Sequence, residues 1–517
     1  MSRYTLAEVL RKNRSAPGVN QDRVAAVFGD QERTYEAIDT RSNQLAHALA
    51  AQGFEHGDRV GVMLYNRLEW LEVFFAIAKL GGVMVPLNYL LRPAEVEFLL
   101  TDSQARWVVY EAALETSLAD GPAGGHRRYL RLDGPDRADA DLEYEEILDG
   151  MSTAEFRPEG YAVGSDDLVL LQYTSGTTGS PKGAMHTHST VMWNSFHQIV
   201  DYSISSRDVV LVVPALCWAA GFHDLALASL WTGGRVVISP STGFTPERFL
   251  RTVEAQQVTA TLLVPTVLKR VLECSGLRDY DLTSLRLVCS GGEPVPLTAI
   301  DEFHDSFGGC DLLQVFGLSE FPSMMLYINP ADARRKVGST GKACSAAEVR
   351  IVGPDDQEVA AGETGEIICR SPANMIGYYG RDDATRATLR DGWLHTGDLG
   401  TVDESGFVYV SGRSKDMIIT GGLNVYPAEV ERVLSQHPAI AEAAVVGEPS
   451  DEFGETGLAF VVLAEGHEVE ASDLIAYLRL ELAAYKVPRH YKLSREPLPR
   501  TTSGKVQKFR LRGGIEV

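Results

Sequence analysis

Cysteine is scarce in this chain and long apolar runs are missing. The six cysteines among 517 residues lie far apart with no C-x-x-C pair, which argues against a zinc knuckle or a disulfide framework and indicates a reducing compartment. The longest uncharged apolar run, 209–222, is interrupted by Pro214 and is shorter than the roughly 20 residues of a membrane helix. Residues 1–18 contain Glu8 and a basic cluster, unlike a signal peptide. We therefore expect a cytoplasmic protein that is not a membrane protein.

Positive charge is also in short supply. The chain has 48 Lys and Arg against 70 Asp and Glu, a formal net charge of −22. Such a surface repels phosphate backbones and anionic lipid headgroups. We therefore expect no nucleic-acid partner, and an anionic small molecule would need a local group of Lys or Arg.

Two common catalytic signatures do not occur. The chain has neither G-x-S-x-G nor G-x-G-x-x-G, so the motif support for an α/β-hydrolase or a classical dinucleotide fold is missing. The segment His186-Thr187-His188 offers two histidines without a third ligand, a poor metal site. We interpret it as the start of a helix.

The order of helix-like and strand-like segments predicts an α/β fold. Strand-like stretches at 59–64 and 83–85 flank Trp70, Val73, Phe74 and Ile77, which recur at helical spacing. Repeated βαβ units indicate layered α/β subdomains around buried parallel sheets. From about Gly362, short glycine-punctuated strands indicate a small β-barrel or hairpin region. We predict a large N-terminal domain (1–412), a polar hinge (413–416) and a small mobile α+β C-terminal domain (417–517).

A loop rich in hydrogen-bond donors follows the strand-like segment 168–171. Residues 173–183 read YTSGTTGSPKG, so glycines free backbone N–H groups, hydroxyls add donors, and Lys182 adds a charge. Pro181 and Gly183 do not fit a Walker A loop. A plain surface turn is the alternative, but turns seldom gather so many donors directly after a buried strand. The loop is therefore predicted to hold phosphates.

This loop and six further motifs resemble the adenylate-forming superfamily of acyl-CoA synthetases, amino-acid adenylation domains and beetle luciferases. The further motifs stand in the same order as in that family: Ser290-Gly291-Gly292-Glu293-Pro294, Val315-Phe316-Gly317-Leu318-Ser319-Glu320, Gly392-Trp393-Leu394-His395-Thr396-Gly397-Asp398, Gly412-Arg413-Ser414-Lys415-Asp416, Gly421-Gly422-Leu423-Asn424 and Pro499-Arg500-Thr501-Thr502-Ser503-Gly504-Lys505. The resemblance spans nearly the whole chain.

The resemblance implies a complete nucleotide site. Phosphates would contact the loop residues Thr174, Ser175, Gly176, Thr177, Thr178 and Lys182. Adenine and AMP would contact Gly292, Glu293, Pro294, Phe316, Gly317, Leu318, Ser319, Asp398 and Arg413. Phe316 would stack on adenine, Asp398 would accept the ribose hydroxyls, although its residue type alone also fits a turn cap, and Glu320 would hold Mg²⁺.

The resemblance also implies two half-reactions. Lys505 would stabilise the charge that develops when a carboxylate attacks the α-phosphate, which makes it the predicted catalytic residue together with Glu320. The small domain would then rotate about Lys415, and Gly421 and Gly422 would face the tunnel for the coenzyme A thiol.

In this family the stretch after a proline chooses the acid, here Pro214 to Asp224. Trp218 is our predicted pocket gate, with Gly317 as a further lining residue. His223 is the alternative gate, and a satisfied buried histidine is an equally good reading of it. Few charges surround this stretch, so a hydrophobic carboxylic acid such as a fatty acid is expected.

The resemblance thus implies an acyl-CoA synthetase that uses ATP, Mg²⁺ and coenzyme A, with a possible homodimer. A freestanding enzyme that loads a carrier protein is the nearest alternative, because Asp224 could pair with a substrate amine, although no carrier domain follows Lys505. A catalytically dead binding protein is disfavoured by the intact Lys182, Glu320 and Lys505.

Overall fold

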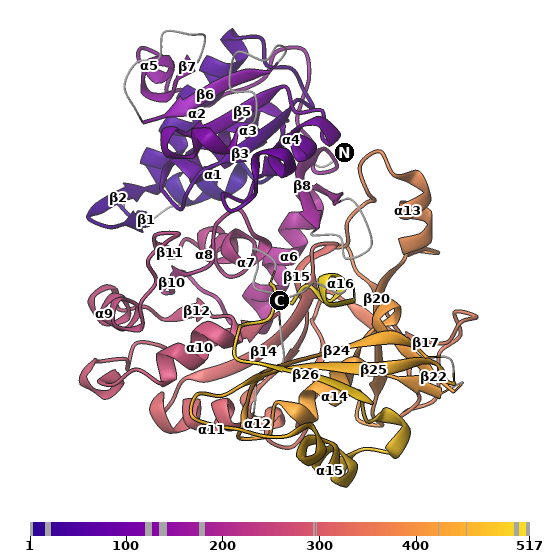
Figure 1. The fold of residues 1–517 in the computed structure, drawn as a ribbon. Helices are drawn as coiled ribbons and strands as arrows, with labels where there is room; N and C mark the ends of the chain where they lie inside the picture. The colour runs from indigo at the N-terminus through magenta and orange to yellow at the C-terminus, as the bar shows by residue number, and fades with distance from the viewer. Residues whose placement is uncertain are drawn as a thin grey trace.

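The computed structural model describes residues 4–15, 22–118, 127–133, 142–174, 181–292, 295, 297–421, 423–450, 452–500 and 506–512. In this part of the chain the strands form sheets of seven, nine, five and five strands. In Figure 1 the seven-stranded sheet lies at the top, the nine-stranded sheet below it, and the C-terminal sheet at the lower right. Helices and sheets alternate along the chain, which confirms the predicted α/β class with a large N-terminal and a small C-terminal part.

The seven-stranded sheet has the order β7-β6-β5-β3-β4-β8-β9. Its strands are β3 (Arg59–Met63), β4 (Val83–Pro86), β5 (Trp107–Glu111), β6 (Arg128–Leu132), β7 (Leu142–Glu143), β8 (Leu168–Thr174) and β9 (Lys182–Thr187). Its helices are α2 (Tyr35–Ala51), α3 (Glu69–Leu80), α4 (Pro93–Asp102) and α5 (Tyr144–Leu148). Trp70, Val73, Phe74 and Ile77 are buried in α3, as their spacing predicts.

The nine-stranded sheet has the order β16-β15-β14-β13-β12-β10-β11-β1-β2. Its strands are β1 (Val24–Phe28), β2 (Gln31–Thr34), β10 (Val209–Val212), β11 (Arg235–Ile238), β12 (Ala260–Leu262), β13 (Leu287–Gly291), β14 (Asp311–Leu318), β15 (Phe321–Ile328) and β16 (Lys342–Ala343). The accompanying helices are α1 (Glu8–Ser15), α6 (His188–Asp201), α7 (Ala219–Phe222), α8 (Ala226–Thr232), α9 (Pro246–Gln256), α10 (Pro265–Leu272), α11 (Leu297–Ser306) and α12 (Pro330–Ala333).

Both large sheets are mixed, which corrects the expectation of parallel sheets. The pairs from β1 through β11, β10, β12 and β13 to β14 are parallel. The pairs β1–β2, β14–β15, β15–β16 and β8–β9 are antiparallel. These antiparallel pairs lie at sheet edges, where a short connection can return the chain as a hairpin without a crossover helix.

The predicted β-rich segment is an antiparallel sheet with the order β17-β18-β20-β19, and β21 pairs with β20. Its elements are β17 (Glu348–Val352), β18 (Gly365–Arg370), α13 (Asp382–Thr388), β19 (Leu389–Arg390), β20 (Trp393–Val402) and β21 (Val408–Arg413). An isolated bridge between Gly341 and Val408 ties it to the chain just before β16.

The chain changes sheet across the short 3-10 helix η4 (Ser414–Asp416), where we predict the hinge. The C-terminal sheet has the order β23-β22-β25-β24, with β26 beside β25. Its elements are β22 (Ile418–Thr420), β23 (Leu423–Val425), α14 (Pro427–Leu434), β24 (Ile440–Ser450), β25 (Gly454–Leu463), α15 (Ala471–Glu481), β26 (His490–Ser494) and α16 (Lys508–Arg512). This is the predicted compact α+β unit.

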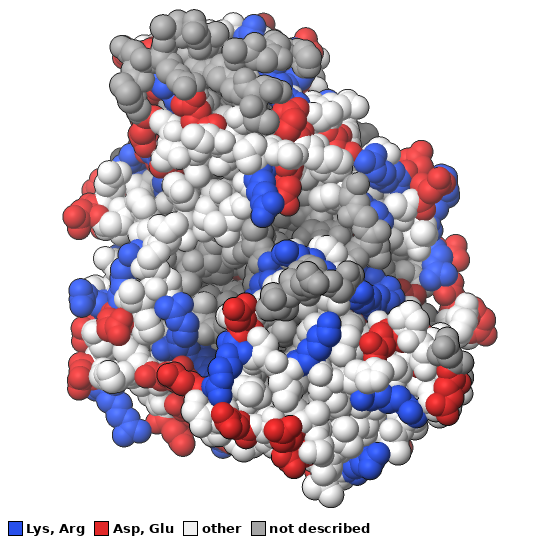
Figure 2. Space-filling view, in the orientation of Figure 1, with Lys and Arg blue, Asp and Glu red and all other residues white. Residues whose placement is uncertain are grey.

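The surface carries charges of both signs. On the face shown in Figure 2, Lys and Arg side chains are interspersed with Asp and Glu side chains. None of the helices in the described ranges is long and apolar enough to cross a bilayer.

Candidate active site

The predicted phosphate loop connects two antiparallel strands. Thr174 ends β8, Lys182 begins β9, and the two residues face each other in the register of the hairpin. Ser175, Gly176, Thr177 and Thr178 lie outside the described residues. The hairpin therefore brings the ends of the loop together and fixes where the loop emerges from the sheet.

A segment far along the chain packs beside this hairpin. Ala184 forms an isolated bridge with Tyr378, and the Tyr379 N–H donates to the Gly183 carbonyl over 2.9 Å. The Tyr378 ring centroid consequently lies 5.1 Å from the Lys182 ammonium. An ammonium over an aromatic face is attracted by the ring, so Tyr378 helps to hold Lys182 in place.

Tyr378 also holds Glu320. Its hydroxyl donates to Glu320 Oε1 over 2.6 Å, a charge-assisted hydrogen bond. The Met375 N–H donates to the backbone carbonyl of Glu320 over 2.8 Å. Burial, then the Glu320 charge, raises the pKa of Tyr378, so the hydroxyl keeps its proton and acts as a donor. Lys182, Tyr378 and Glu320 thus form one cluster, whose aromatic member sequence reasoning missed.

The predicted AMP-binding residues Phe316, Gly317 and Leu318 end β14, and Ser319 and Glu320 form the turn into β15. The His186 Nε2 atom lies 2.9 Å from the Ser319 carbonyl oxygen. A carbonyl only accepts, so Nε2 carries the proton and donates. Burial lowers the pKa of His186 to about 4, which keeps the ring neutral. This histidine lies in β9 and α6 begins at His188, so the interpretation of His186 as part of a helix was wrong: pairing with β8 extends the strand.

Asp398, Arg413 and Lys415 form the other half of the site. Asp398 and Arg413 are partners in the β20–β21 register, and Arg413 Nε lies 2.7 Å from Asp398 Oδ1. Lys415 Nζ is buried and makes no hydrogen bond within the described ranges. Burial lowers the pKa of Lys415, while the charge of Asp398 opposes this shift. The predicted ribose acceptor and the predicted hinge are therefore electrostatic neighbours.

The two halves lie within electrostatic range of each other. The Arg413 charge lowers the pKa of Tyr378, against the larger effect of burial, so Arg413 lies within electrostatic range of the Lys182–Tyr378–Glu320 cluster. Gly292 directly follows β13 and has a φ of +90°. Strand β13 pairs with β14, the strand that carries Phe316. Glu293 and Pro294 lie outside the described residues.

The predicted acid-binding stretch forms the turn into α7. Trp218 precedes this helix and is half-buried. A Cβ atom added at Gly221 would lie 1.9 Å from the Ala215 carbonyl oxygen, closer than atoms can approach. Only glycine fits at position 221, because the backbone passes so close to Ala215. We call residues 218–223 the wall, and the close approach at Gly221 fixes its backbone path.

His223 is buried, with 2% of its surface exposed. Its carbonyl accepts hydrogen bonds from Asn194 Nδ2 (3.0 Å) and Gln198 Nε2 (2.9 Å) on α6. Burial, followed by the nearby charge of His186, lowers its pKa to about 3, so the ring is neutral at physiological pH. His223 is thus an uncharged part of the wall.

A strained turn follows His223. Leu225 has a φ of +61°, and the Ala226 N–H donates to the Asp224 carbonyl over 2.6 Å, the pattern of a γ-turn that non-glycine residues rarely adopt. Gln198 Oε1 accepts the Leu225 N–H over 2.7 Å. Such strain persists where surrounding contacts enforce it and is frequent at functional sites.

Gly421, predicted to face the thiol tunnel, occupies the turn between β22 and β23 with a φ of +57°. Its N–H donates to the Phe453 carbonyl over 2.8 Å. Ile419 and Leu423, on either side of this turn, are about half exposed, at 48% and 50%. Gly422 and the predicted catalytic Lys505 lie outside the described residues.

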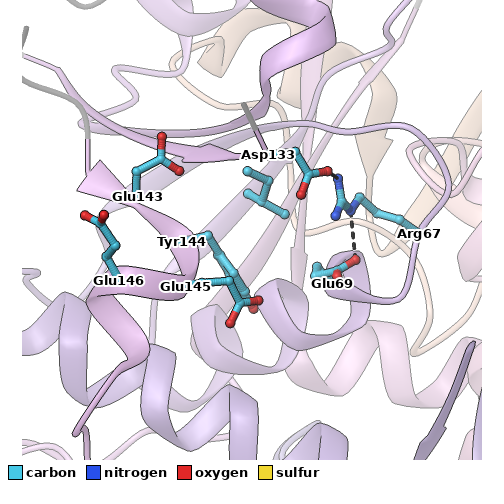
Figure 3. Close-up of a pocket in the computed structure, with 8 residues that line it drawn as sticks. Arg67, Glu69, Asp133, Glu143, Tyr144, Glu145 and Glu146 are labelled. Atoms are coloured by element: carbon cyan, nitrogen blue, oxygen red, sulfur yellow. Dashed lines mark hydrogen bonds and ion pairs between the residues drawn. The ribbon is translucent and has the colours of Figure 1, made fainter. Parts of the chain in front are cut away.

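A pocket of about 190 Å³, lined by none of the candidate site residues, lies beside the seven-stranded sheet. Figure 3 shows Arg67 between Glu69 and Asp133, with Glu143, Glu145 and Glu146 around the cavity. The Arg67 guanidinium pairs with Glu69 at 2.8 Å and Asp133 at 2.6 Å. Its charge is already neutralised, so this acidic pocket is a poor site for a phosphate or a carboxylate.

Comparison with known proteins gives full-length matches. The family profile described as "AMP-binding enzyme" matches residues 14–379, and "AMP-binding enzyme C-terminal domain" matches residues 429–505. A feruloyl-CoA synthase of Amycolatopsis sp is 38% identical over 488 residues, 94% of this chain and 95% of that protein. An indoleacetate–CoA ligase of Aromatoleum aromaticum is 36% identical, covering 95% of each chain. The structure of the anthranilate CoA ligase AuaEII with anthranoyl-AMP superimposes with a TM-score of 0.88 at 29% identity, covering 99% of this chain and 97% of that one.

Proposed function

Because this chain belongs to the AMP-binding enzyme family, in the acyl-CoA synthetase branch of the adenylate-forming enzymes, we propose that the cleft between β9, β14 and β20 is where it activates a hydrophobic carboxylic acid. The enzyme is an AMP-forming acid–thiol ligase that uses ATP, Mg²⁺ and coenzyme A. The observation that carries the placement is the convergence of Lys182, Tyr378 and Glu320 beside Arg413.

The described donors fit a magnesium–nucleotide complex. Glu320 offers a carboxylate oxygen, the ligand type that Mg²⁺ prefers, and Tyr378 fixes this carboxylate over 2.6 Å. Mg²⁺, when bound, neutralises charge on the phosphates. Lys182 adds a positive charge at the base of the phosphate loop, so a metal-binding carboxylate and an ammonium would both act on the phosphates.

In the first half-reaction we assign the protein an electrostatic role. An oxygen of the acid bonds to the α-phosphorus while the bond from that phosphorus to the bridging oxygen breaks, and pyrophosphate leaves. Negative charge concentrates between two anions in this step. Lys182 and, by our proposal, Lys505 stabilise this charge in the transition state, while Asp398 orients the ribose and Arg413 holds Asp398.

In the second half-reaction the coenzyme A thiolate bonds to the acyl carbonyl carbon and AMP leaves. We place the hinge at Lys415 and the thiol path at Gly421 and Gly422. Sheet membership changes across η4, so a rotation there would move the C-terminal domain as one body. The half-exposed Ile419 and Leu423 give the Gly421 turn apolar flanks for the pantetheine arm.

The acid is proposed to be aryl-substituted. The feruloyl-CoA and indoleacetate relatives act on aromatic acids by their names, and the proposed acid-binding stretch contains the half-buried indole of Trp218. Flat rings pack well against aromatic side chains. Fatty acids are the second candidates.

A panel of aryl, alicyclic and fatty acids tests this proposal through AMP formation. We expect AMP release that requires coenzyme A and is fastest with an aryl acid. Release that requires an added carrier protein instead would favour the carrier-loading alternative. No pyrophosphate exchange into ATP with any acid would overturn the proposed site.

We also propose a cytoplasmic location and a possible homodimer. Light scattering of the purified chain tests the dimer, and a mass of one chain at micromolar concentration would contradict it.

A further inference from the structure

Three side chains that the proposed reaction does not use meet where α6 packs against the edge of the nine-stranded sheet. His197 and Asp201 lie four positions apart on α6, and Cys344 directly follows β16. Their ligand atoms all lie within 4.8 Å of one another. His197 and Cys344 are each 2% exposed, and the Asp201 side chain is 7% exposed. An imidazole, a carboxylate and a thiol thus lie close together in a largely buried position.

The hydrogen bonds of Asn194 determine which nitrogen of His197 carries a proton. Asn194 Nδ2 donates to the His223 carbonyl over 3.0 Å, so Asn194 Oδ1 is the atom that lies 3.1 Å from His197 Nε2. An amide oxygen only accepts, and Nε2 must therefore be the N–H donor. In the neutral ring, Nδ1 then carries a lone pair. This is the arrangement that orients metal-bound histidines, in which the second ring nitrogen donates to a carbonyl.

The lone pair of Nδ1 points toward other acceptors. Nδ1 is buried and makes no hydrogen bond to the described residues, and it lies 3.4 Å from Asp201 Oδ2. Two buried acceptors at this distance repel each other unless a proton or a metal ion lies between them. Bonds of about 2.0–2.2 Å from a tetrahedral zinc to nitrogen and oxygen place these two ligand atoms about 3.3–3.5 Å apart. The observed 3.4 Å between His197 Nδ1 and Asp201 Oδ2 lies within this range.

We propose that His197 Nδ1, Asp201 Oδ2 and Cys344 Sγ bind a structural zinc ion. The mixed nitrogen, oxygen and sulfur set suits zinc, whereas Mg²⁺ takes oxygen ligands. On binding, the Cys344 thiol releases its proton to solvent and a thiolate–zinc bond forms. A water molecule completes the tetrahedral coordination.

The ion would clamp α6 to the sheet edge. The Ser345 N–H already donates to Asp201 Oδ2 over 2.9 Å, and the Cys344 N–H donates to the Met325 carbonyl on β15 over 2.9 Å. Asp201 on α6 and Cys344 after β16 are therefore already held by backbone hydrogen bonds. Asn194 links the site to the His223 wall, so the clamp would also steady the acid-binding stretch.

Metal analysis of the full chain tests the zinc site. The chain is stripped with a chelator, equilibrated with zinc chloride, gel-filtered and assayed by inductively coupled plasma mass spectrometry. We expect one zinc per chain for the wild type and less than a fifth of this for Cys344→Ser and His197→Gln. Cys274→Ser is the matched control, because Cys274 is the half-exposed thiol, and it should keep the zinc.

Cobalt substitution of the unaltered chain supplies a second readout that does not depend on the folding of variants. A thiolate-to-cobalt charge-transfer band should appear with one equivalent of cobalt. No stoichiometric zinc and no such band would overturn the proposal, as would zinc that survives Cys344→Ser but disappears in Cys274→Ser. A shared proton between His197 and Asp201 would then explain their approach. Pyrophosphate exchange tests the reaction separately, so failure of the zinc site leaves the proposed function standing.

Discussion

Replacing Tyr378 with phenylalanine should remove the hydrogen bond that positions Glu320 while keeping the aromatic ring in place. The change removes one hydroxyl from a ring that is 6% exposed and leaves the Lys182 contact with the aromatic face. It deletes the 2.6 Å hydrogen bond to the Glu320 carboxylate. The perturbation falls on the position of a carboxylate that we assign to Mg²⁺ and also removes a side-chain hydrogen bond between the same hydroxyl and Thr388.

The size of the effect follows from the type of bond. A hydrogen bond to a charged group contributes about 1.5–3 kcal/mol, and about 1.4 kcal/mol corresponds to a factor of ten. We expect kcat/KM for magnesium–ATP in the adenylation step to fall about 10- to 150-fold. The KM for the acid should change little, because Tyr378 lies on the phosphate side of the cleft.

The assay is pyrophosphate exchange over a range of Mg²⁺ concentrations. Tyr379→Phe is the matched control, because the Tyr379 hydroxyl contacts Gln104 at 3.3 Å instead of Glu320. In a Glu320→Gln background, Tyr378→Phe should add less than about a threefold loss, since the charge-assisted bond is already gone. Equal losses in the two tyrosine variants, or an unchanged Mg²⁺ requirement in Tyr378→Phe, would refute this reasoning.

Further predictions address the C-terminal domain and the buried histidines. Lys505→Ala should slow adenylation by orders of magnitude and leave thioester formation from supplied acyl-adenylate largely intact; equal loss in both steps would contradict its role. Lys415→Pro should give the reverse pattern, because proline restricts the backbone where we place the hinge, as separate assays of the two steps would show. Burial lowers the pKa of His186, His188 and His223 to about 4, 4 and 3, so the unfolded state binds more protons below pH 6.5. Their stabilisation is complete above pH 6.5 and is lost as the pH falls toward 3, by up to about 1.4 kcal/mol per pH unit for each histidine; urea unfolding at pH 7, 6 and 5 should show this, and a flat profile would oppose it.

Local pattern predicted the elements that support the site. The strand before the phosphate loop, the helical spacing of Trp70 to Ile77 and the polar stretch at 413–416 were readable because each depends on neighbouring residues. Thr174, Lys182 and Glu320 were found through motifs, and the structure places them around one hairpin and one turn.

Contacts between distant segments were not readable. Tyr378 and Glu320 are 58 positions apart, and they meet because residues 375–379 pack against both Glu320 and β9. The return strand β9 was missed because its register depends on β8, while its own residues give a weak signal. The spacing of His197, Asp201 and Cys344 in the sequence does not resemble a metal-binding motif, because Cys344 follows β16 whereas the other two lie on α6.

If residues 214–224 line the acid pocket as we propose, the close return of the backbone at Gly221 limits how the choice of acid can change. Even a methyl group there would collide with the Ala215 carbonyl, so neither natural drift nor engineering can trim or fill the pocket through that position. Trp218, Ala219 and Ala220 are only partly buried, so in the proposed pocket they are the positions where substitutions could change the acid preference without altering the backbone path at Gly221.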